Sequence, residues 1–389
     1  MLNTYFADMH IHIGKDIFDK PVKITASKNL TITNILKEAS RNKGIKLIGV
    51  IDCQSPNVQL ELKQLLDKGL AYELQEGGIR FEEVTLILGS EIEVYDENCH
   101  GPIHVLCYLP GLKEMEMFSE WLITKMKNIT LSSQRYYGSA KDLQYKVKEL
   151  SGIFIPAHVF TPYKSLYGRG VFSSLKEVFD SDLIDGIELG LSSDTSMADQ
   201  ITELHSYTFV TNSDAHSLAK IGREYQEVLM EEPSFKEFNY ALHRVDGRKI
   251  IRNFGMNPKL GKYHNTVCDK CLNAMNPNML VCDNCGSKKI VKGVADRIKE
   301  LANFEGDYNE RPPYLYQVPL EYLPKLGPKT FKKLLDHFDT EMNIIHHVSY
   351  EKLAEVVPEH IAKSIILMRE GKLSIHAGGG GKYGSVSDT

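Results

Sequence analysis

Asp8-Met9-His10-Ile11-His12 is the stretch of sequence that decides both the fold and the chemistry of this chain. It follows a short apolar run, which is typical of the end of a buried β-strand. Because side chains at positions i and i+2 point to the same face of a strand, Asp8, His10 and His12 are expected to converge. Neutral imidazole is the commonest protein ligand for metals, and a nearby carboxylate can orient it. Taken alone, the segment is equally consistent with a surface strand that carries two histidines.

Short apolar runs alternate with amphipathic stretches through the first 245 residues or so. This alternation predicts repeated βα units. Seven strands with intervening helices favour a barrel-like α/β domain, in which reactive groups lie at the carboxyl ends of the strands. The expected strands are residues 4–9, 47–52, 85–93, 103–109, 152–157, 185–189 and 207–212, and the expected helical segments include 32–41, 59–70, 115–126, 141–150 and 173–179.

Polar residues stand at the ends of most of these expected strands. A single histidine after an apolar run is more often structural than a ligand. Six polar endings on one face of one domain, counting the first segment, are hard to explain as core or capping residues. After the first segment, these endings are Asp52-Cys53, Glu91, His104, His158 and Asp214-Ala215-His216.

These segments resemble the ordered motifs of the polymerase and histidinol phosphatase (PHP) superfamily. The resemblance covers roughly residues 1–245 and implies a distorted (βα)7 barrel that holds two or three divalent metals (Zn, Mg or Mn) and hydrolyses phosphoesters. The matching motifs are Asp8-x-His10-x-His12, Gly89-Ser90-Glu91, His104-Val105-Leu106-Cys107-Tyr108, Pro156-Ala157-His158 and Ser213-Asp214-Ala215-His216.

The resemblance also implies a role for each ligand. One metal would lie among His10, His12, Glu91 and Asp214. Glu91 would bridge to a second metal held with His104 and His158, and His216 would serve a third. Such a cluster activates water and neutralises phosphate charge, so no serine or cysteine nucleophile is needed. We therefore expect hydrolysis by metal-activated water, with Asp214, Glu91 and His158 essential for catalysis.

The chain departs from the superfamily at Asp52-Cys53, where the usual second residue is histidine. Cysteine thiolate binds zinc but is a poor ligand for magnesium or manganese. With Cys53 as a candidate ligand, the third site is altered, zinc-selective or vacant. Asp52 is either a ligand or an outer neighbour of the site.

Loops around this face contain candidate contacts to a nucleic acid. The segment 160–170 follows His158 and mixes aromatic and basic residues with glycine, so it is suited to stack a base and to contact phosphate. An ordinary solvated loop explains the same composition. The candidates near the barrel are Tyr163, Lys164, Tyr167, Arg169, Ser192 and Arg223.

Four of the seven cysteines are grouped in the second half of the chain. Two Cys-x2-Cys pairs complete a closed zinc site with four thiolate ligands, which leaves no position open for a substrate. We therefore expect a structural zinc ion. The grouping also favours metal binding in a reducing compartment over a disulfide framework. The predicted ligands are Cys268, Cys271, Cys282 and Cys285.

The tail of the chain is expected to be helical. Residues 323–335 resemble one unit of a helix-hairpin-helix, which binds DNA phosphate through backbone N–H groups. The predicted contacts are Lys325, Gly327 and Lys329, although Lys325 stands where the first hairpin glycine is usual. Residues 353–366 resemble a degenerate second unit, but a plain pair of helices explains the same pattern. For the glycine-rich residues 378–384 we expect a flexible tail, with ordering by DNA as the alternative.

Composition and charge are compatible with this organisation. Of the 389 residues, 42% are hydrophobic and 25% charged, which is ordinary for a globular protein. We find neither a secretory leader nor a run of 18 apolar residues, and so expect no membrane contact. Residues 1–248 carry a net charge of −9 and residues 249–389 a net charge of +4. An acidic front half suits bound cations, and a mildly basic rear half permits a polyanion.

The order of barrel, ribbon and tail is similar to that of the endonuclease Q family over essentially the whole chain. Residues 186–194, 212–217 and 221–224 match it particularly closely. The resemblance implies repair of double- or single-stranded DNA that contains uracil, hypoxanthine, xanthine or an abasic site, with cleavage on the 5′ side of the lesion. The expected domains are a PHP barrel (1–245), a zinc ribbon (246–302), and a linker with a helical DNA-binding tail (303–389).

Two other functions stay open at the level of sequence. A small-molecule phosphoesterase similar to histidinol phosphatase would need neither ribbon nor tail. A DNA-binding adaptor with an inactive barrel would need both, but the intact candidate ligands count against it. We expect a monomer in the cytoplasm, associated with the nucleoid.

Overall fold

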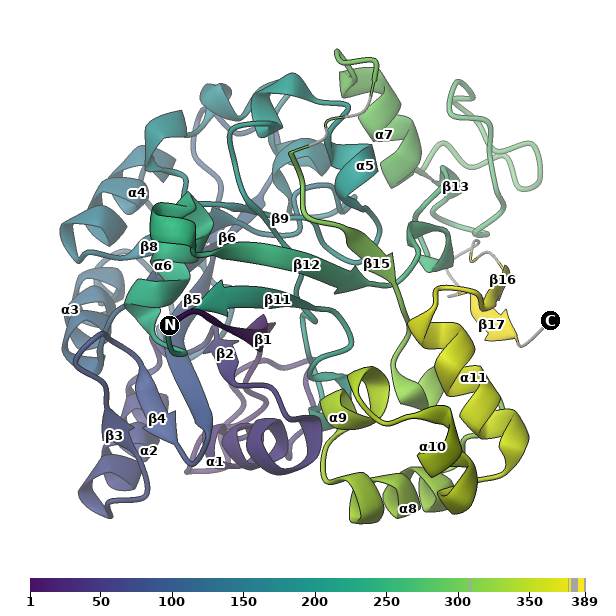
Figure 1. The fold of residues 1–389 in the computed structure, drawn as a ribbon. Helices are drawn as coiled ribbons and strands as arrows, with labels where there is room; N and C mark the ends of the chain where they lie inside the picture. Colours follow the sequence, from purple (N-terminus) through teal and green to yellow (C-terminus); the bar gives the residue numbers. More distant parts are fainter. Residues whose placement is uncertain (307, 309, 377, 379–383, 388–389) are drawn as a thin grey trace.

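Seven strands surround the interior of the barrel, and all seven lie where the sequence predicts them (Figure 1). The computed structural model describes residues 1–306, 308, 310–376, 378 and 384–387. The expected barrel-like α/β architecture is confirmed. The wall strands are β1 (Asn3–Ile11), β2 (Leu47–Val50), β5 (Val84–Val94), β6 (Ile103–Leu109), β8 (Ile153–Pro156), β9 (Ile187–Glu188) and β10 (Phe209–Val210). Five belong to one large sheet, and β9 and β10 form a separate two-stranded sheet beside it.

The direction of β6 departs from a simple repeat of βα units. β1, β2 and β5 run parallel, whereas β6 is antiparallel to both β5 and β8. The first residues of β6 consequently lie beside the last residues of β5, and His104 is the register partner of Glu93. His104 thus reaches the same edge of the barrel as Glu91, although it stands at the beginning of its strand.

Further strands extend the sheet beyond β1. β11 (Tyr225–Met230) pairs antiparallel with β1, β12 (Lys249–Gly255) with β11, and β15 (Tyr314–Tyr316) pairs parallel with β12. The expected domain boundary at residue 245 is therefore too early, because β12 belongs to the barrel sheet. Short strands at the other edge are β3 (Tyr72–Glu73), β4 (Ile79–Phe81) and β7 (Arg135–Tyr136).

Helices cover the outside of the barrel wall (Figure 1). Ser139 and Ser234 begin two of them, and each side chain accepts a hydrogen bond from a first-turn N–H that has no partner within the helix. Residues 173–179, expected to be helical, form only the 3-10 turn η3 (Leu175–Glu177). The helices are α1 (Ile32–Lys37) with its π-helical continuation η1 (Glu38–Lys43), α2 (Pro56–Asp67), α3 (Leu112–Ile123), α4 (Ala140–Glu149), α5 (Thr195–Ala198) and α6 (Phe235–His243).

The apolar core has an inner and an outer layer. The inner layer fills the barrel, and a larger cluster packs between the wall, the helices and the tail. Gly49 permits the close approach of β2 to β1, because a Cβ atom there would lie 2.4 Å from Met9 O. Residues of the inner layer include Ala7, Met9, Leu47, Ile51, Ile87, Leu106, Tyr108, Ile153, Ile155 and Val210.

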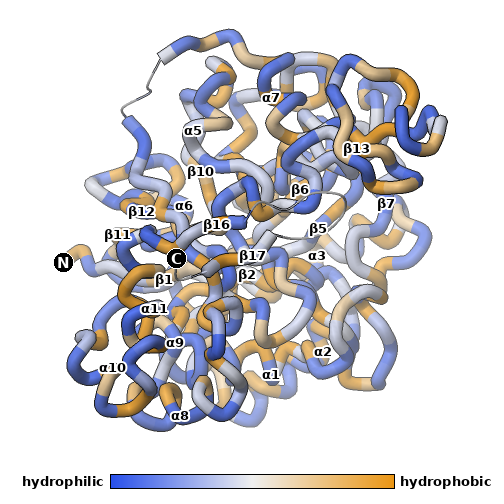
Figure 2. The backbone as a smooth tube through the Cα atoms, turned by 90° about the vertical axis from the view of Figure 1, so that its right-hand side faces the viewer, coloured by the Kyte–Doolittle hydropathy of each residue, from blue (hydrophilic) through white to orange (hydrophobic). Residues whose placement is uncertain are grey.

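The cysteine-bearing segment and the helical tail flank one face of the barrel. In Figure 2 the ribbon around β13 lies at the top of this face and helices α8–α11 lie at the bottom. In the ribbon, β13 (Val267–Cys268) pairs antiparallel with β14 (Ile290–Val291). The tail elements are α8 (Pro328–Phe338), α9 (Glu341–His346), α10 (Tyr350–Val356), α11 (Glu359–Arg369), β16 (Ser374–His376) and β17 (Ser385–Ser387), and α7 (Val294–Leu301) follows the ribbon.

Polar contacts fix both parts to the barrel. Arg297 of α7 donates to the carbonyl oxygens of Tyr167 and Val171. The buried Lys43 ammonium donates to Glu341 Oε2 of α9 at 2.6 Å and to Ala219 O at 2.9 Å. Of the glycine-rich residues 378–384, only 378 and 384 are among the described residues.

No helix in the described part of the chain combines the length and the apolar character needed to cross a membrane.

His346 of α9 anchors the tail in an aromatic pocket of the barrel. Its ring stacks on Phe6 with ring centroids 4.6 Å apart and meets Tyr225 and Phe254 at steeper angles. The Tyr225 hydroxyl lies 2.7 Å from His346 Nε2. Burial, followed by the charges of His347, Arg369 and Arg252, lowers the pKa of His346 to about 3. His346 is therefore neutral in the folded protein.

We expect this anchor to weaken as the pH falls below about 6.5. The unfolded histidine gains a proton near that pH, whereas the docked histidine does not. The contribution of His346 to stability is complete above pH 6.5 and is lost as the pH falls towards 3. Between pH 7 and pH 5 the loss should be about 1–2 kcal/mol, visible as a lower free energy of unfolding in denaturant titrations.

Two variants separate this effect from general acid destabilisation. His346→Phe keeps a ring in the pocket and should lose less stability than the wild type between pH 7 and pH 5. His360→Phe changes an exposed histidine of α11 and should keep the wild-type pH dependence. An equal loss in the wild type and in His346→Phe would contradict the assignment.

Candidate active site

Six predicted ligands meet at one edge of the barrel and form two groups. In the first group, Asp214 Oδ1 lies 3.5 Å from His10 Nε2 and 3.4 Å from His12 Nε2. Within each group the ligand atoms lie within 4.8 Å of one another. The groups are His10, His12 and Asp214, from the end of β1 and the loop after β10, and Glu91, His104 and His158, from β5, the start of β6 and the loop after β8.

Glu91 faces both groups. Its Oε1 lies 2.9 Å from His104 Nδ1, 3.3 Å from His158 Nε2 and 3.6 Å from His10 Nε2. Its Oε2 lies 3.7 Å from His12 Nε2. This position fits the role of a bridge between two ions, as the superfamily resemblance implies.

The six ligand residues of these two groups are called the metal cluster below. Several of its ring nitrogens are buried and have no hydrogen-bond partner among the described residues. They include His10 Nε2, His12 Nε2 and His104 Nε2. A buried polar atom without a partner is costly. Imidazole nitrogens that converge with carboxylates form a donor set for Zn²⁺ or similar divalent ions. The residues present therefore fit a divalent metal ion at each group.

Polar groups behind the two β1 histidines hold their rings in place. Glu188 Oε1 lies 2.9 Å from His10 Nδ1. Asp52 Oδ2 and Ser132 Oγ each lie 3.1 Å from His12 Nδ1. Contacts at Nδ1 leave Nε2 of each ring directed at the cluster. In this structure Asp52 is thus an outer neighbour of the site, which was one of its two expected positions.

Glu188 is the main residue that the sequence analysis missed. Besides His10, its carboxylate accepts hydrogen bonds from Asn212 Nδ2 at 2.7 Å and from the backbone N–H of His158 at 2.8 Å. The Glu188 carboxylate therefore connects the carboxyl ends of β1, β8 and β10. The signal was present in the sequence, because Glu188 ends the apolar strand β9 just as Glu91 follows the apolar part of β5.

The charges of the cluster keep its carboxyl groups ionised. Burial opposes ionisation of Glu91, but His104 and Lys23 hold its pKa well below the usual range. Burial likewise opposes ionisation of Asp214, whose pKa is held well below its usual range by His10 and His12. Both carboxylates are therefore available as ligands at neutral pH.

The same charges stabilise a proton on His10. Burial lowers its pKa, but Glu188 and Asp214 together raise it to about 10. Because a metal binds only the deprotonated nitrogen, an ion at this position has to displace a proton, and its affinity falls as the pH falls.

The structure does not bring Cys53 to the cluster. Its thiol donates to Val50 O at 3.2 Å inside the apolar core, and burial raises its pKa. The expectation of a thiolate ligand at this position therefore fails, because a thiolate there would be an unpaired buried charge. His216 does reach the site, with Nε2 3.3 Å from Asp214 Oδ1. Among the described residues, His216 is not part of a third ligand group.

Asp8 and Arg223 fix the loop that carries Asp214. The carboxylate of Asp8 accepts hydrogen bonds from Ser213 N at 3.0 Å and Gly222 N at 2.8 Å. The Arg223 guanidinium donates to Ser213 O and Asp214 O. Asp214 itself has a φ of 46°, a strained backbone conformation of the kind found at functional sites. Asp8 and Arg223 thus shape the site, and the expected contact of Arg223 with DNA stays a prediction.

A pocket of about 220 Å³ opens beside the metal ligands. Tyr163 and Tyr263 meet edge to face on one side, with ring centroids 5.6 Å apart. Gly190 on the barrel side has a φ of 77°, and a Cβ there would lie 2.8 Å from His158 Cβ, so glycine is required. The lining residues are His158, Thr161, Pro162, Tyr163, Glu188, Gly190, Leu191, Ser192, Asn212, Asp214, Lys262 and Tyr263.

Two of the residues expected to contact DNA, Tyr163 and Ser192, line this pocket. The guanidinium of Arg169 lies 5.7 Å from the centre of the Tyr163 ring. Lys164 is not among the residues that line the pocket, and its Nζ lies 2.8 Å from Glu93 Oε2.

Tyr167 lies outside the pocket. Its side chain is fully buried, and its hydroxyl donates to Glu203 at 2.8 Å. The expectation that Tyr167 contacts DNA is therefore wrong for this structure. The mixed composition of the loop predicted an exposed ring, but this ring packs against Phe160 with centroids 5.4 Å apart.

The hairpin of the tail forms where the sequence predicts it. Lys325 has a φ of 63°, the left-handed conformation that usually favours glycine. Gly327 is the N-cap residue of α8, and Lys329 is exposed in its first turn. The lysine thus adopts the conformation of the usual glycine.

The four cysteines of the ribbon lie at the corners of a metal site. The Sγ atoms of Cys268 and Cys285 are 3.6 Å apart, as are those of Cys271 and Cys282. Zinc–sulfur bonds of about 2.3 Å in a tetrahedron place sulfur atoms about 3.8 Å apart. Hydrogen bonds from the Asn273 backbone and the Asn284 side chain lower the pKa of Cys271 to about 6. The donor set fits a closed zinc site.

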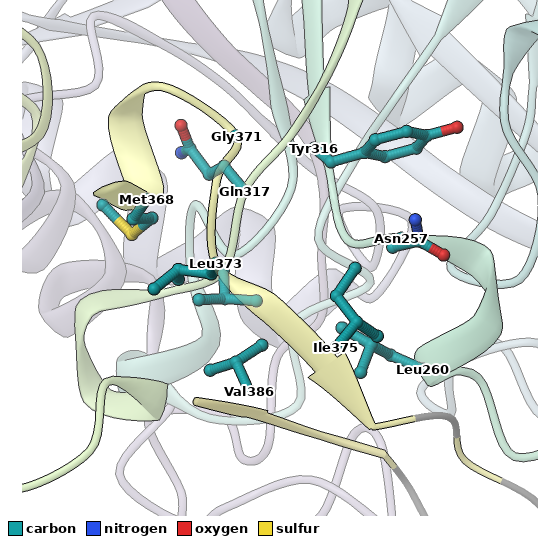
Figure 3. A pocket seen from close by; sticks show the side chains of 10 residues that line it. Asn257, Leu260, Tyr316, Gln317, Met368, Gly371, Leu373, Ile375 and Val386 are labelled. Carbon is teal, nitrogen blue, oxygen red and sulfur yellow. The ribbon is translucent and has the colours of Figure 1, made fainter. Parts of the chain in front are cut away.

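A second hollow lies between the tail and residues 257–260 (Figure 3). Apolar side chains such as Leu260, Met368 and Leu373 line it, and its volume of about 30 Å³ is near that of one water molecule. It contains none of the candidate metal ligands, so it is not the active site.

Comparisons with known proteins agree with this arrangement. A sequence model of a family described as PHP-associated matches residues 194–245. The protein YqxK of Bacillus subtilis is 52% identical over 99% of this chain and 100% of its own length.

Two solved structures also match nearly the whole chain. The lesion-specific endonuclease PfuEndoQ of Pyrococcus furiosus is 33% identical, with a TM-score of 0.85 over 99% of this chain and 95% of its own. An endonuclease Q bound to a 27-mer duplex with an abasic lesion at its active site is 32% identical, with a TM-score of 0.84 over 99% and 96%. This chain belongs to the endonuclease Q family.

Proposed function

We propose that this protein is a DNA repair endonuclease that recognises deaminated bases and abasic sites and hydrolyses the phosphodiester on the 5′ side of the lesion. The observation that carries the proposal is the pocket beside the metal ligands, which shares His158 and Asp214 with the two ligand groups and is also lined by Glu188. A phosphate at the cluster and a base in the pocket would then belong to one nucleotide. The related endonuclease Q with an abasic lesion at its active site supports this arrangement.

The size and lining of the pocket suit one base that has turned out of the helix. About 220 Å³ is less than the 300–1,000 Å³ of sites for drug-sized ligands. The rings of Tyr163 and Tyr263 offer stacking surfaces, and Ser192 offers a hydroxyl donor. Deamination replaces an exocyclic amine by a carbonyl, so a donor in the pocket favours the deaminated base over the normal one.

The residues of the cluster have separate tasks in this proposal. Divalent ions held by the two groups supply an activated water and neutralise charge on the phosphate. Glu91 and Asp214 provide the carboxylates, and His158 lies between the metal ligands and the base pocket. Glu188 and Asp52 orient the histidines of β1, so the cluster is organised before the substrate arrives.

In this proposal the ribbon and the tail hold the flanking DNA. They lie at opposite ends of the face seen in Figure 2. Lys325, the N-terminus of α8 after Gly327, and Lys329 form a phosphate-binding surface of the helix-hairpin-helix type. Turning a base out of the stack costs a few kcal/mol, and contacts to the backbone contribute energy without reading the sequence.

Two other functions account for fewer of these features. A small-molecule phosphomonoesterase does not require the ribbon or the tail hairpin. A DNA-binding adaptor without activity does not require the unpartnered imidazole nitrogens, whose burial is costly without a metal.

Incision assays with defined duplexes test the proposal. Each duplex contains one deoxyuridine, deoxyinosine or abasic site and is incubated with Mg²⁺, Mn²⁺ or Zn²⁺, beside an undamaged duplex and a small phosphomonoester. We expect a single cut 5′ to each lesion and none in the undamaged duplex. Absence of lesion-dependent incision would refute the repair function, and phosphomonoester cleavage alone would favour the small-molecule alternative.

A further inference from the structure

Lys23 lies inside the metal cluster, yet it belongs to no predicted motif. It stands in the segment between β1 and α1, which backbone hydrogen bonds hold next to two of the candidate ligands. Lys23 N donates to Ile13 O at 2.8 Å, just beyond His12, and Ser27 N donates to His216 O at 2.8 Å. Only 16% of the Lys23 side chain is exposed. The backbone therefore directs a long basic side chain into the site.

The ammonium of Lys23 has one donor left over. Nζ donates to Glu91 Oε2 at 3.2 Å and to Ser133 Oγ at 2.7 Å. Since an ammonium has three N–H groups, the third has no acceptor among the described residues. A fixed donor with one free N–H beside metal ligands is suited to an anionic oxygen of a substrate.

The ammonium of Lys23 is a positive charge at the edge of the metal ligands. It lies 3.2 Å from Glu91 Oε2, the oxygen that faces His12, and a lysine side chain is ordinarily charged at neutral pH. Its attraction to Glu91 also competes with metal ions for that carboxylate, so a role as mere support for metal binding is physically unfavourable.

We infer that Lys23 is a catalytic residue whose third N–H contacts a non-bridging oxygen of the scissile phosphate and stabilises the charge that builds up there. Glu91 and Ser133 fix the ammonium in advance, so little reorganisation is needed during the reaction. The inference rests on the proposed phosphodiester hydrolysis but not on recognition of a lesion.

Three variants test the contact. Lys23→Met removes the charge and keeps the length of the side chain, and Lys23→Arg keeps the charge. Lys20→Met is the matched control, because Lys20 lies exposed in the same segment. The substrates are bis(4-nitrophenyl) phosphate, a small diester that needs no DNA recognition, and the deoxyuridine duplex. Metal content is measured by plasma mass spectrometry, and affinity for inorganic phosphate by calorimetry.

A phosphate contact predicts a distinct combination of results. Lys23→Met should lower kcat on both substrates by about 100-fold and weaken phosphate binding, with metal content unchanged or raised. Lys23→Arg should recover part of the loss, and Lys20→Met should behave as the wild type. Unchanged kcat or phosphate affinity in Lys23→Met would overturn the inference. Loss of metal from this variant would also overturn it, because the role of Lys23 would then be to hold Glu91 in position as a metal ligand.

The two proposals fail in different ways. If the wild type hydrolyses the small diester but never cuts beside a lesion, the repair function fails and the role of Lys23 is still decided by the diester. If the wild type cuts lesion duplexes and Lys23→Met cuts them equally well, the repair function stands and the role of Lys23 is refuted.

Discussion

Asp214→Ala should abolish turnover, with a fall in kcat of at least about 1,000-fold. The reason is the central position of this carboxylate. A single oxygen of Asp214 lies within 3.5 Å of His10 Nε2 and within 3.4 Å of His12 Nε2. The carboxylate also borders the pocket proposed for the base. Its removal takes away one ligand of the first metal group. The buried Nε2 atoms of His10 and His12 then lose the carboxylate oxygen that lies between them.

The measurement combines incision kinetics with metal analysis. We expect the variant to lose metal from the barrel and to keep the zinc of the ribbon. The far-UV circular dichroism spectrum should be unchanged, because the backbone of the loop is fixed by Asp8 and Arg223 and not by the Asp214 carboxylate. Asp19→Ala is the control, since Asp19 is an exposed carboxylate 80% accessible to solvent. Near-normal hydrolysis by a folded Asp214→Ala protein would contradict the metal-cluster assignment.

Much of the site could be predicted from sequence because the ligands follow a simple geometric rule. His10, His12, Glu91, His158 and Asp214 each stand at or just beyond the polar end of a buried strand. Strand ends of a barrel meet at one edge, so the pattern in the sequence becomes proximity in the structure. The motif order then indicated the superfamily, and the cysteine spacing indicated the ribbon.

The remaining residues escaped prediction because their roles depend on contacts between distant segments. Lys23 and Ser133 lie in irregular loops, and no period or spacing connects them with Glu91. Cys53 follows a strand like the true ligands, but its thiol faces the apolar core. Tyr167 lies in a loop of polar and aromatic residues, yet its ring packs inward. In such segments the tertiary packing, and not the local pattern, decides which way a side chain points.

Domain boundaries were also beyond the reach of local patterns. β12 and β15 lie outside the residues assigned to the barrel, but both extend its sheet. A strand is assigned to a domain by its hydrogen-bond partners, and these partners are far away in the sequence. The antiparallel direction of β6 could not be predicted for the same reason, because the local sequence does not show which strands β6 pairs with.

Cys282→Ser should unfold the ribbon while the barrel stays folded. Cys282 is 2% exposed, and with Cys268 and Met275 it forms a small cluster separate from the barrel core. A two-stranded sheet of two residues per strand is too small to be stable alone. Structural zinc supplies about 10–16 kcal/mol in zinc-finger peptides. Loss of one thiolate therefore removes the main interaction that orders this segment.

The consequence for activity should depend on the substrate. Tyr263, which lines the base pocket, directly precedes the ribbon, so incision of lesion duplexes should fall by at least about 100-fold. Hydrolysis of bis(4-nitrophenyl) phosphate should be nearly unchanged, because Glu91, Asp214 and the histidines belong to the barrel. Zinc content should fall by one ion per chain, and limited proteolysis should cut within residues 264–292.

Cys99→Ser is the matched control, because Cys99 is also nearly buried but lies outside the ribbon. It should retain zinc, protease resistance and both activities. If Cys282→Ser lost the diester activity together with incision, the ribbon would be required for the fold of the barrel and not for engagement of DNA. If it lost neither activity, the Tyr263 side of the pocket would not take part in lesion recognition, because that side depends on the ribbon for its position.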